Sequence, residues 1–278
     1  MGYVKFLGTA GARFVVARQL RFSAGTWIEL GGTQLLLDPG PGTLLRLRKS
    51  RPPLDPLKLD AILLSHKHLD HSTDVNIVIE AMADGGYKKR GALFAPADAL
   101  EGDDPVVLRY VRPFLERIET WQAGGEYAVG QVMVRPVSHA HGTVESYGLV
   151  LDSADGRMGF VTDTRFSPGL AAQYAGCHLL VLNVVLKDWR PDVDHLCIPE
   201  AGEIIAAVKP HLAVLTHFGT TMLRGNPRAL ATSLAEKVGT RVVAASDGLA
   251  IEASEWRDWQ RRDEPGTMEC ETRREHEA

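Results

Sequence analysis

The hydrophobic pattern of the first 65 residues predicts a set of short strands. Short apolar runs bounded by glycine, proline and polar residues are typical of strands, and such runs occupy residues 4–7, 26–30, 33–37 and 61–64. Gly31-Gly32 predicts a tight hairpin turn between the second and third strands. A short helix is expected at 43–49, and apolar residues at helical spacing predict another at 74–83.

The second half of the chain repeats this pattern with longer helices between the strands. Strands are expected at residues 132–137, 147–151, 158–162, 179–182, 212–216 and 241–244. Pro199 is well placed to open a helix that reaches Val208, and Asn226-Pro227 is typical of the start of a helix, here one that reaches Val238. Two strand-rich halves with helices between them predict an α/β fold of two sheets packed face to face, with the helices outside.

No repeat at a fixed period interrupts this pattern, so we expect a single domain over residues 1–256. Residues 257–278 are mostly charged and lose the apolar periodicity, which predicts a solvated or flexible tail. Within 100–122, apolar residues recur at helical spacing and predict an amphipathic core helix. Our secondary hypothesis is that this helix borders the cleft or a dimer surface. Its apolar positions are Val107, Tyr110, Val111, Phe114 and Ile118.

Composition narrows the class of protein. The chain has 278 residues, is 45% hydrophobic and carries a net charge of −4 with a pI near 6.2, which argues against binding long nucleic acid by bulk charge. Three cysteines without CxxC spacing indicate neither a disulfide framework nor a thiolate zinc site. No apolar run approaches the ~20 residues of a membrane span, and no signal-peptide pattern opens the chain, so we expect a cytoplasmic protein.

The ten histidines are the unusual feature of the composition, because histidine is the commonest metal ligand. Four candidate ligands, His66, His68, Asp70 and His71, directly follow the strand expected at 61–64. His66 and His68 are two residues apart in an extended segment, so their side chains point the same way and can bind one ion. Asp70 and His71 come after the chain starts to turn and can therefore face a second site.

A two-metal site needs further ligands at strand ends. His141 follows the strand expected at 132–137, Asp163 ends the one at 158–162, and His217 ends the one at 212–216. We expect Asp163 to bridge two ions, with one carboxylate oxygen for each, and a shared hydroxide to complete both sites. Zinc is the expected metal, and manganese and iron also suit these ligands. The full assignment is His66, His68 and His141 for one ion, and Asp70, His71 and His217 for the other.

These motifs resemble the metallo-β-lactamase superfamily, whose HxHxDH signature stands at residues 66–71. The chain looks most similar to the ribonuclease Z branch and its small phosphodiesterase relatives over roughly residues 3–250. The supporting segments are Phe6-Leu7-Gly8-Thr9, Leu37-Asp38-Pro39-Gly40-Pro41-Gly42-Thr43 and Leu215-Thr216-His217-Phe218. The resemblance implies a four-layer αβ/βα sandwich with the metal ions at one edge, between the sheets.

The resemblance also implies a catalytic histidine that binds no metal. His195 stands just before a predicted helix, where the family has a residue that stabilises the scissile phosphate and protonates the leaving oxygen. His139 competes with His141 for one ligand position. We prefer His141 for its distance to Tyr147-Gly148, and leave a role of His139 behind the ligands open. We expect His178, His211 and His276 to be structural or exposed.

Two bound cations lower the pKa of a bridging water toward ~7, so hydrolysis is the expected reaction, with Asp70 aiming the hydroxide and His195 assisting the leaving group. In ribonuclease Z, a long arm that grips tRNA lies between the residues matched by His141 and Asp163. Here only a hairpin fits between them. We therefore expect a phosphodiesterase acting on a small phosphodiester or cyclic phosphate. The expected partner is a small anionic substrate, we expect neither long nucleic acid nor a membrane as a partner, and a homodimer stays open.

Two other classes of enzyme fit the same signature less well. A lactone, thioester or other carboxylic ester hydrolase using the same metal site is the alternative function. Its glyoxalase-type members carry a helical substrate domain that the residues after 250 do not supply. A redox diiron protein of this superfamily would replace His68 with a carboxylate and add a flavin domain. A non-catalytic binding module is disfavoured because every expected ligand is intact.

Overall fold

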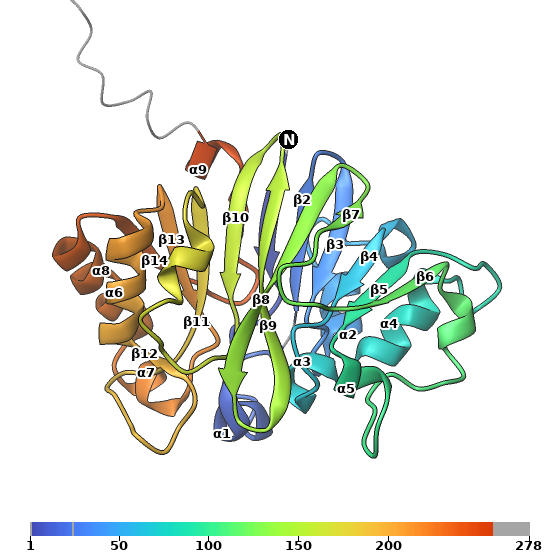
Figure 1. Ribbon diagram of the computed structural model, residues 1–278, viewed down its shortest axis with the longest axis horizontal. Coiled ribbons are helices and arrows are strands. Elements are labelled where there is room, and N and C mark those ends of the chain that lie inside the picture. Colours follow the sequence, from blue (N-terminus) through green and yellow to red (C-terminus); the bar gives the residue numbers. More distant parts are fainter. Residues whose placement is uncertain (1, 24, 258–278) are drawn as a thin grey trace, which may run out of the picture.

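Two β-sheets pack face to face, and helices cover both outer faces, in the computed structural model (Figure 1). The structure describes residues 2–23 and 25–257. The first sheet has the strand order β15-β1-β2-β3-β4-β5-β6, and the second has the order β14-β13-β11-β10-β9-β8-β7 with β12 paired to β11. This arrangement confirms the four-layer α/β sandwich expected from the sequence.

The first half of the chain builds most of one sheet with its helices. Its elements are β1 (Tyr3–Phe6), α1 (Ala12–Ala17), β2 (Thr26–Leu30), β3 (Thr33–Leu37), α2 (Thr43–Lys49), η1 (Pro56–Lys58), β4 (Ala61–Leu63), α3 (Leu69–Ser72), α4 (Val75–Met82), β5 (Ala92–Ala95), α5 (Ala97–Leu100), η2 (Arg112–Phe114) and β6 (Arg117–Thr120). From β3 to β6 neighbouring strands run parallel. The carboxyl ends of β3 to β6 therefore lie at one edge of this sheet.

The second half builds the other sheet and returns to the first. Its elements are β7 (Tyr127–Val129), β8 (Val132–His141), β9 (Val144–Ser153), β10 (Gly156–Val161), η3 (Ala171–Tyr174), β11 (Leu179–Leu186), β12 (Leu196–Cys197), α6 (Ile198–Val208), β13 (Leu212–Thr216), α7 (Thr220–Arg224), α8 (Pro227–Val238), β14 (Arg241–Ala244), β15 (Ala250–Glu252) and α9 (Ser254–Arg257). β15 pairs with β1, so the last described strand closes the first sheet.

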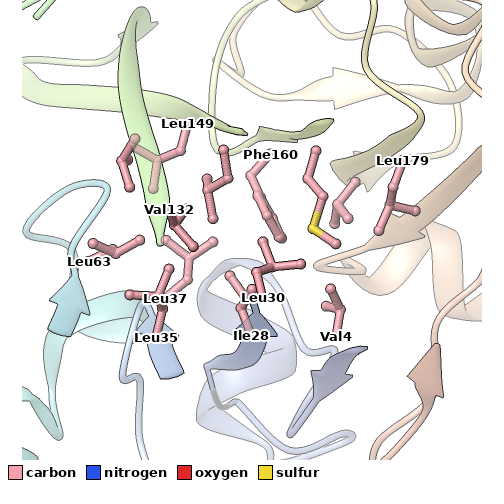
Figure 2. Packing of buried hydrophobic residues seen from close by; sticks show 14 of the residues in the cluster. Val4, Ile28, Leu30, Leu35, Leu37, Leu63, Val132, Leu149, Phe160 and Leu179 are labelled. Atoms are coloured by element: carbon pink, nitrogen blue, oxygen red, sulfur yellow. The ribbon is translucent and has the colours of Figure 1, made fainter. Parts of the chain in front are cut away.

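The core between the sheets consists of inward-facing aliphatic and aromatic side chains (Figure 2). Ile28 and Leu30 of the first sheet pack in one cluster with Leu149 and Phe160 of the second. Burial of such apolar surface is worth about 25 cal/mol per Å². The alternation of strand residues places the opposite side chains on the outer faces, where they pack in two further clusters against α2 and α4 or against α6 and α8.

The predicted helix within 100–122 is wrong. The described chain forms α5, an irregular stretch, η2 and β6 here, although Val107 and Val111 are buried as the spacing suggested. In an α-helix, Pro113 would lack the backbone donor of that position, and its ring would clash with the preceding turn. The Arg112 guanidinium then satisfies carbonyl groups that a helix would pair, since it donates to the carbonyl oxygens of Val107 and Leu100.

Several boundaries also differ from the sequence predictions. β8 continues to His141 instead of stopping at residue 137, because its polar last residues pair with β9, from Ser138↔Tyr147 to His141↔Val144. β5, β6, β7 and the short helices α1, α5 and α7 were not predicted. The predicted tail beyond Arg257 lies outside the described residues, and the single-domain division stays a prediction. Within the described part of the chain, no helix has the length and apolarity required to span a bilayer.

Candidate metal centre

The carboxyl ends of strands from both sheets bring the predicted ligands together. β4 leads into the loop with His66 and His68, and the next turn of chain forms α3, which carries Asp70 and His71. The other three come from the second sheet: His141 ends β8, Asp163 follows β10, and His217 follows β13. All seven predicted residues therefore gather at one edge between the sheets.

Asp163 occupies the middle of this cluster. Its side chain is 2% exposed, and its Oδ2 atom faces five imidazoles. This atom lies 3.3 Å from Nε2 of both His71 and His217, 3.7 Å from Nδ1 of His195, 3.8 Å from Nε2 of His141 and 3.9 Å from Nε2 of His66. The other oxygen, Oδ1, accepts a hydrogen bond from Asn183 Nδ2 at 2.8 Å. The two carboxylate oxygens thus have different surroundings.

The remaining ligands form two groups around Asp163. His66, His68 and His141 are mutually close, as are Asp70, His71 and His217, with their candidate ligand atoms within 4.8 Å of one another in each group. His141 Nε2 and His68 Nδ1 are 3.1 Å apart. Two nitrogens that bind one zinc ion at about 2.0–2.1 Å are about 3 Å apart. This pair therefore already has the spacing that a shared metal ion requires.

Orphaned nitrogen atoms show that this cluster fits metal ions. The Nε2 atoms of His66, His71 and His217 are buried and have no hydrogen-bond partner. Buried polar atoms without a partner are rare because each costs about 1–3 kcal/mol. Cations bound at the two ligand groups would give all three atoms a partner. The donor set of imidazoles and carboxylates matches the ligands that zinc, manganese and iron(II) accept.

Hydrogen bonds behind the ligands fix the ring atom that each histidine presents. Asp38 Oδ2 accepts a hydrogen bond from His71 Nδ1 at 2.9 Å and another from Ser65 Oγ at 2.7 Å, while Asp38 Oδ1 accepts from the Ser65 backbone N–H at 2.7 Å. With its own proton donated to Asp38, Ser65 Oγ accepts from His66 Nδ1 at 2.9 Å. Asp38 therefore orients His71 directly and His66 through Ser65, which leaves both Nε2 atoms for a metal.

The same arrangement recurs at His141, whose Nδ1 donates to the backbone carbonyl of Asp194 at 2.8 Å. The Asp194 carboxylate accepts from the Gly142 N–H and from Arg165. These bonds fix the loop that carries His195 beside the end of β8. The contacts of Asp38, Ser65 and Asp194 were missed by the sequence analysis, although Asp38 stands at the end of a buried strand within the 37–43 segment.

Burial and mutual charge set the protonation of the cluster. Burial disfavours ionisation of Asp163, but the surrounding imidazoles, His217 foremost, hold the pKa of its carboxyl well below the usual range. Burial also disfavours a charged His71, but the nearby carboxylates, led by Asp163, raise its pKa well above the usual value. Burial lowers the pKa of His66 and His68. Neutral imidazoles and an ionised carboxylate are the forms that bind metals, so a charged His71 would have to release its proton for a metal to bind.

His195 lies beside the cluster as predicted. Its Nδ1 is buried without a hydrogen-bond partner, and burial lowers the pKa of its imidazole to about 4. His139 turns to other partners: its Nε2 pairs with the Tyr174 hydroxyl at 2.8 Å and its Nδ1 with Thr162 Oγ at 3.2 Å. Of the two candidates at the end of β8, His141 is therefore the one that joins the cluster.

Two glycines let neighbouring backbone approach the ligands. A Cβ on Gly40 would clash with the carbonyl oxygen of Asp70, and one on Gly11 would clash with the carbonyl group and the ring of His217. Gly40 lies in the loop between β3 and α2, and Gly11 lies directly before α1. Both positions therefore require a residue without a side chain if the ligands are to keep their places.

Of the other histidines, His178 and His211 lie away from the cluster. Their ring centroids are 5.1 Å apart. His178 Nδ1 accepts from the Arg157 N–H, and His211 Nδ1 donates to the Trp256 carbonyl. Both have structural partners, in line with the sequence expectation, and His276 lies outside the described residues.

Comparison with known proteins agrees with this geometry. A family model described as "Beta-lactamase superfamily domain" matches residues 33–218. An uncharacterized protein of Methanocaldococcus jannaschii is 30% identical over 252 residues, covering 89% of this chain and 93% of the relative. Ribonuclease Z of Methanopyrus kandleri is 26% identical over 290 residues, covering 89% of this chain and 96% of the relative.

Solved structures share the fold over most of the chain. The metallo-β-lactamase fold protein YhfI from Bacillus subtilis superposes with a TM-score of 0.73 at 20% identity, covering 90% of this chain and 99% of that structure. A diphosphatase of the PhnP family superposes with a TM-score of 0.66 at 19% identity, covering 91% and 98% of the two chains. At these identities the likeness shows the fold.

Proposed function

This chain belongs to the beta-lactamase superfamily of metal-dependent hydrolases, and from that premise we propose that it is a dinuclear phosphodiesterase acting on a small phosphodiester or cyclic phosphate. The observation that carries the proposal is the set of buried, unpartnered Nε2 atoms of His66, His71 and His217 around Asp163 Oδ2. Such a set matches two adjacent cation sites that share one carboxylate.

The proposed ligands follow the two groups in the cluster. One ion takes His66 Nε2, His68 Nδ1 and His141 Nε2, and the other takes Asp70, His71 Nε2 and His217 Nε2, with Asp163 between them. Zinc is the proposed metal because its preference for nitrogen and carboxylate ligands matches this set. When bound, the metal ions supply Lewis acidity and lower the pKa of a water toward ~7.

Asp70 and His195 are the proposed catalytic side chains. Asp70 is part-exposed, and its Oδ2 lies 3.6 Å from His217 Nε2 and 3.8 Å from His71 Nε2, so it can accept a hydrogen bond from an attacking water and orient it. His195 has a pKa of about 4 and is neutral at pH 7, so it first offers an N–H to the leaving oxygen. An anionic substrate beside the ring raises this pKa, so the ring can take up a proton and then, as the imidazolium, give that proton to the leaving oxygen.

The names of similar proteins favour a phosphodiester substrate. The positive charge of the proposed metal ions also favours an anionic substrate. Two similar proteins are named ribonuclease Z and diphosphatase, and both names denote cleavage of a bond at phosphorus. The chain between His141 and Asp163 forms the β9–β10 hairpin, which supports a small substrate in place of tRNA. We accordingly propose a small anionic molecule as the partner, with neither nucleic acid nor a membrane required.

Hydrolysis of bis(p-nitrophenyl) phosphate by the zinc-reconstituted protein tests this function. We expect turnover that is lost in Asp70→Ala and reduced about 10²–10⁴-fold in His195→Ala, the range typical of one general acid. His178→Ala is the matched control, since His178 precedes β11 at the opposite end of the strand from the cluster and should leave turnover unchanged.

A parallel series of substrates identifies the class of bond that the protein cleaves. The same protein is offered cyclic nucleotides, linear diesters, lactones and thioesters. Turnover of a diester or cyclic phosphate supports the proposal. A protein that binds its metals and cleaves only lactones or thioesters is instead a carboxylic ester hydrolase using the same centre.

A further inference from the structure

Asn183 is a polar residue in an otherwise apolar buried strand. β11 reads Leu179-Leu180-Val181-Leu182-Asn183-Val184-Val185-Leu186, and its other side chains are buried and apolar. An amide placed among them costs free energy unless its donors and acceptors are paired. Its Nδ2 group donates a hydrogen bond to Asp163 Oδ1, at 2.8 Å.

The position of β11 gives this hydrogen bond its importance. β11 lies between β10, which leads to Asp163, and β13, which leads to His217. In the parallel register, Val161 of β10 pairs with Leu182, and Thr216 of β13 pairs with Asn183. Asn183 therefore lies beside the residues that directly precede the ligands Asp163 and His217. Its side chain lines the same cavity as Asp70, His71 and His217.

The hydrogen bond gives the two oxygens of the Asp163 carboxylate different partners. Oδ1 is engaged by Asn183, while Oδ2 faces the unpartnered Nε2 atoms of His71 and His217 at 3.3 Å and His66 at 3.9 Å. His66 belongs to one ligand group and His71 and His217 to the other. The single atom Oδ2 therefore faces both groups.

We propose that Asn183 is a positioning residue that turns Asp163 so that Oδ2 alone is shared by the two metal ions. This inference rests on the proposed dinuclear function. Rotating the carboxylate to give one oxygen to each ion, or both oxygens to one ion, would cost this hydrogen bond at Oδ1. Asn183 would thereby fix the separation of the ions. Its loss should lower the affinity for the ion that binds second more than the affinity for the ion that binds first.

Asn183→Leu tests the proposal because leucine has a similar volume and no donor. Orienting partners behind metal ligands typically contribute 10–100-fold to affinity. We expect the second zinc ion to bind 10–100-fold more weakly in competition with a chelating dye, with the first affinity changed far less. With Mn²⁺, the paramagnetic resonance signal of a coupled pair should be altered or lost. Unchanged affinities and an unchanged coupled signal overturn the proposal.

Asn76→Leu is the matched control. Asn76 likewise donates a hydrogen bond through its amide, to the Val106 carbonyl, and it also accepts one from the Leu108 N–H, but it lies on α4 outside the cluster. It should destabilise the fold without separating the two metal affinities. An equal loss of the second ion in Asn76→Leu shows that the effect is general destabilisation and overturns the positioning role.

The zinc-loaded wild-type crystal structure is a test that needs no variant. Oδ2 of Asp163 should contact both ions while Oδ1 keeps its bond to Asn183, whereas one oxygen on each ion overturns the inference. The failures are distinguishable. A wild-type protein that binds fewer than two ions contradicts the proposed function, whereas a wild-type protein with two ions and an unaffected Asn183→Leu contradicts only the role of Asn183.

Discussion

Replacing Asp38 by asparagine should weaken metal binding without touching a proposed ligand. The amide side chain of the Asp38→Asn variant can keep its Oδ1 on the Ser65 N–H, which leaves an NH₂ group where Asp38 Oδ2 accepts from His71 Nδ1 and Ser65 Oγ. The NH₂ group then faces two other donors. His71 can accept from this NH₂ group only by moving its own proton to Nε2, the atom that must be free to bind a metal.

The magnitude follows from the bonds that are lost. A hydrogen bond to a charged group contributes about 1.5–3 kcal/mol, and changes behind metal ligands typically reduce affinity 10–100-fold, or about 1.4–2.7 kcal/mol. We expect Asp38→Asn to lower the affinity for the ion held by His71 by 10–100-fold. Ser65→Ala removes the hydroxyl that links Asp38 to His66 but leaves the bond between Asp38 and His71, so it should weaken binding of the other ion instead.

Zinc titration against a chelating dye measures both affinities. Asp60→Asn is the matched control, since Asp60 Oδ2 likewise accepts a backbone N–H, that of Gln34 at 2.8 Å, but precedes β4 at the end away from the cluster. The reasoning is refuted if Asp38→Asn binds both ions as tightly as the wild type, or if Asp60→Asn weakens them equally.

Three further predictions concern packing, thiol chemistry and metal removal. Gly11→Ala should lower zinc affinity at least about tenfold because its Cβ meets His217, whereas Gly169→Ala, where a Cβ meets nothing within 4 Å, should not; equal affinities would contradict this. In a Cys270→Ser background, which removes the thiol outside the described residues, Cys177 and Cys197 should not react with a disulfide reagent at pH 8 until the protein unfolds. Burial raises the pKa of both thiols to about 12, so the reactive thiolate forms only as the pH rises far above 8, and rapid labelling of the native protein would be inconsistent with the packing. Chelation should lower the free energy of unfolding by about 2.7 kcal/mol for each ion removed, relative to protein in zinc at 100 times the Kd of each site, and denaturant unfolding with and without chelator measures the difference.

The parts of the fold that were predicted correctly depend on local signals. β2, β3, α2, α8, β13 and β14 have the predicted bounds, because apolar runs and punctuating Gly, Pro and Asn residues act within a few positions. The helix expected within 100–122 failed because a partly correct burial pattern, with Val107 and Val111 buried but Tyr110 exposed, was taken as a helix. Pro113 and the carbonyl contacts of Arg112 decide the backbone there, and apolar spacing carries no information about either.

The candidate site shows the same division between local and long-range information. His66 to His71 could be read from one short segment, and His141, Asp163 and His217 from their places near strand ends. The partners of these residues could not, because the contact of Asp38 with His71 and that of Asn183 with Asp163 depend on the register of strands distant in sequence. The unequal surroundings of the two Asp163 oxygens likewise exist only once β10, β11 and β13 are aligned.

The metal content of the reconstituted protein tests the central claim most directly. The protein is stripped with chelator, loaded with zinc, dialysed and analysed for metal per chain, beside an Asp163→Asn variant that lacks the charge shared by both ligand groups. The two-ion account predicts two zinc ions per wild-type chain and fewer in the variant. A wild-type chain that retains one metal ion or none after reconstitution with zinc or with manganese contradicts it.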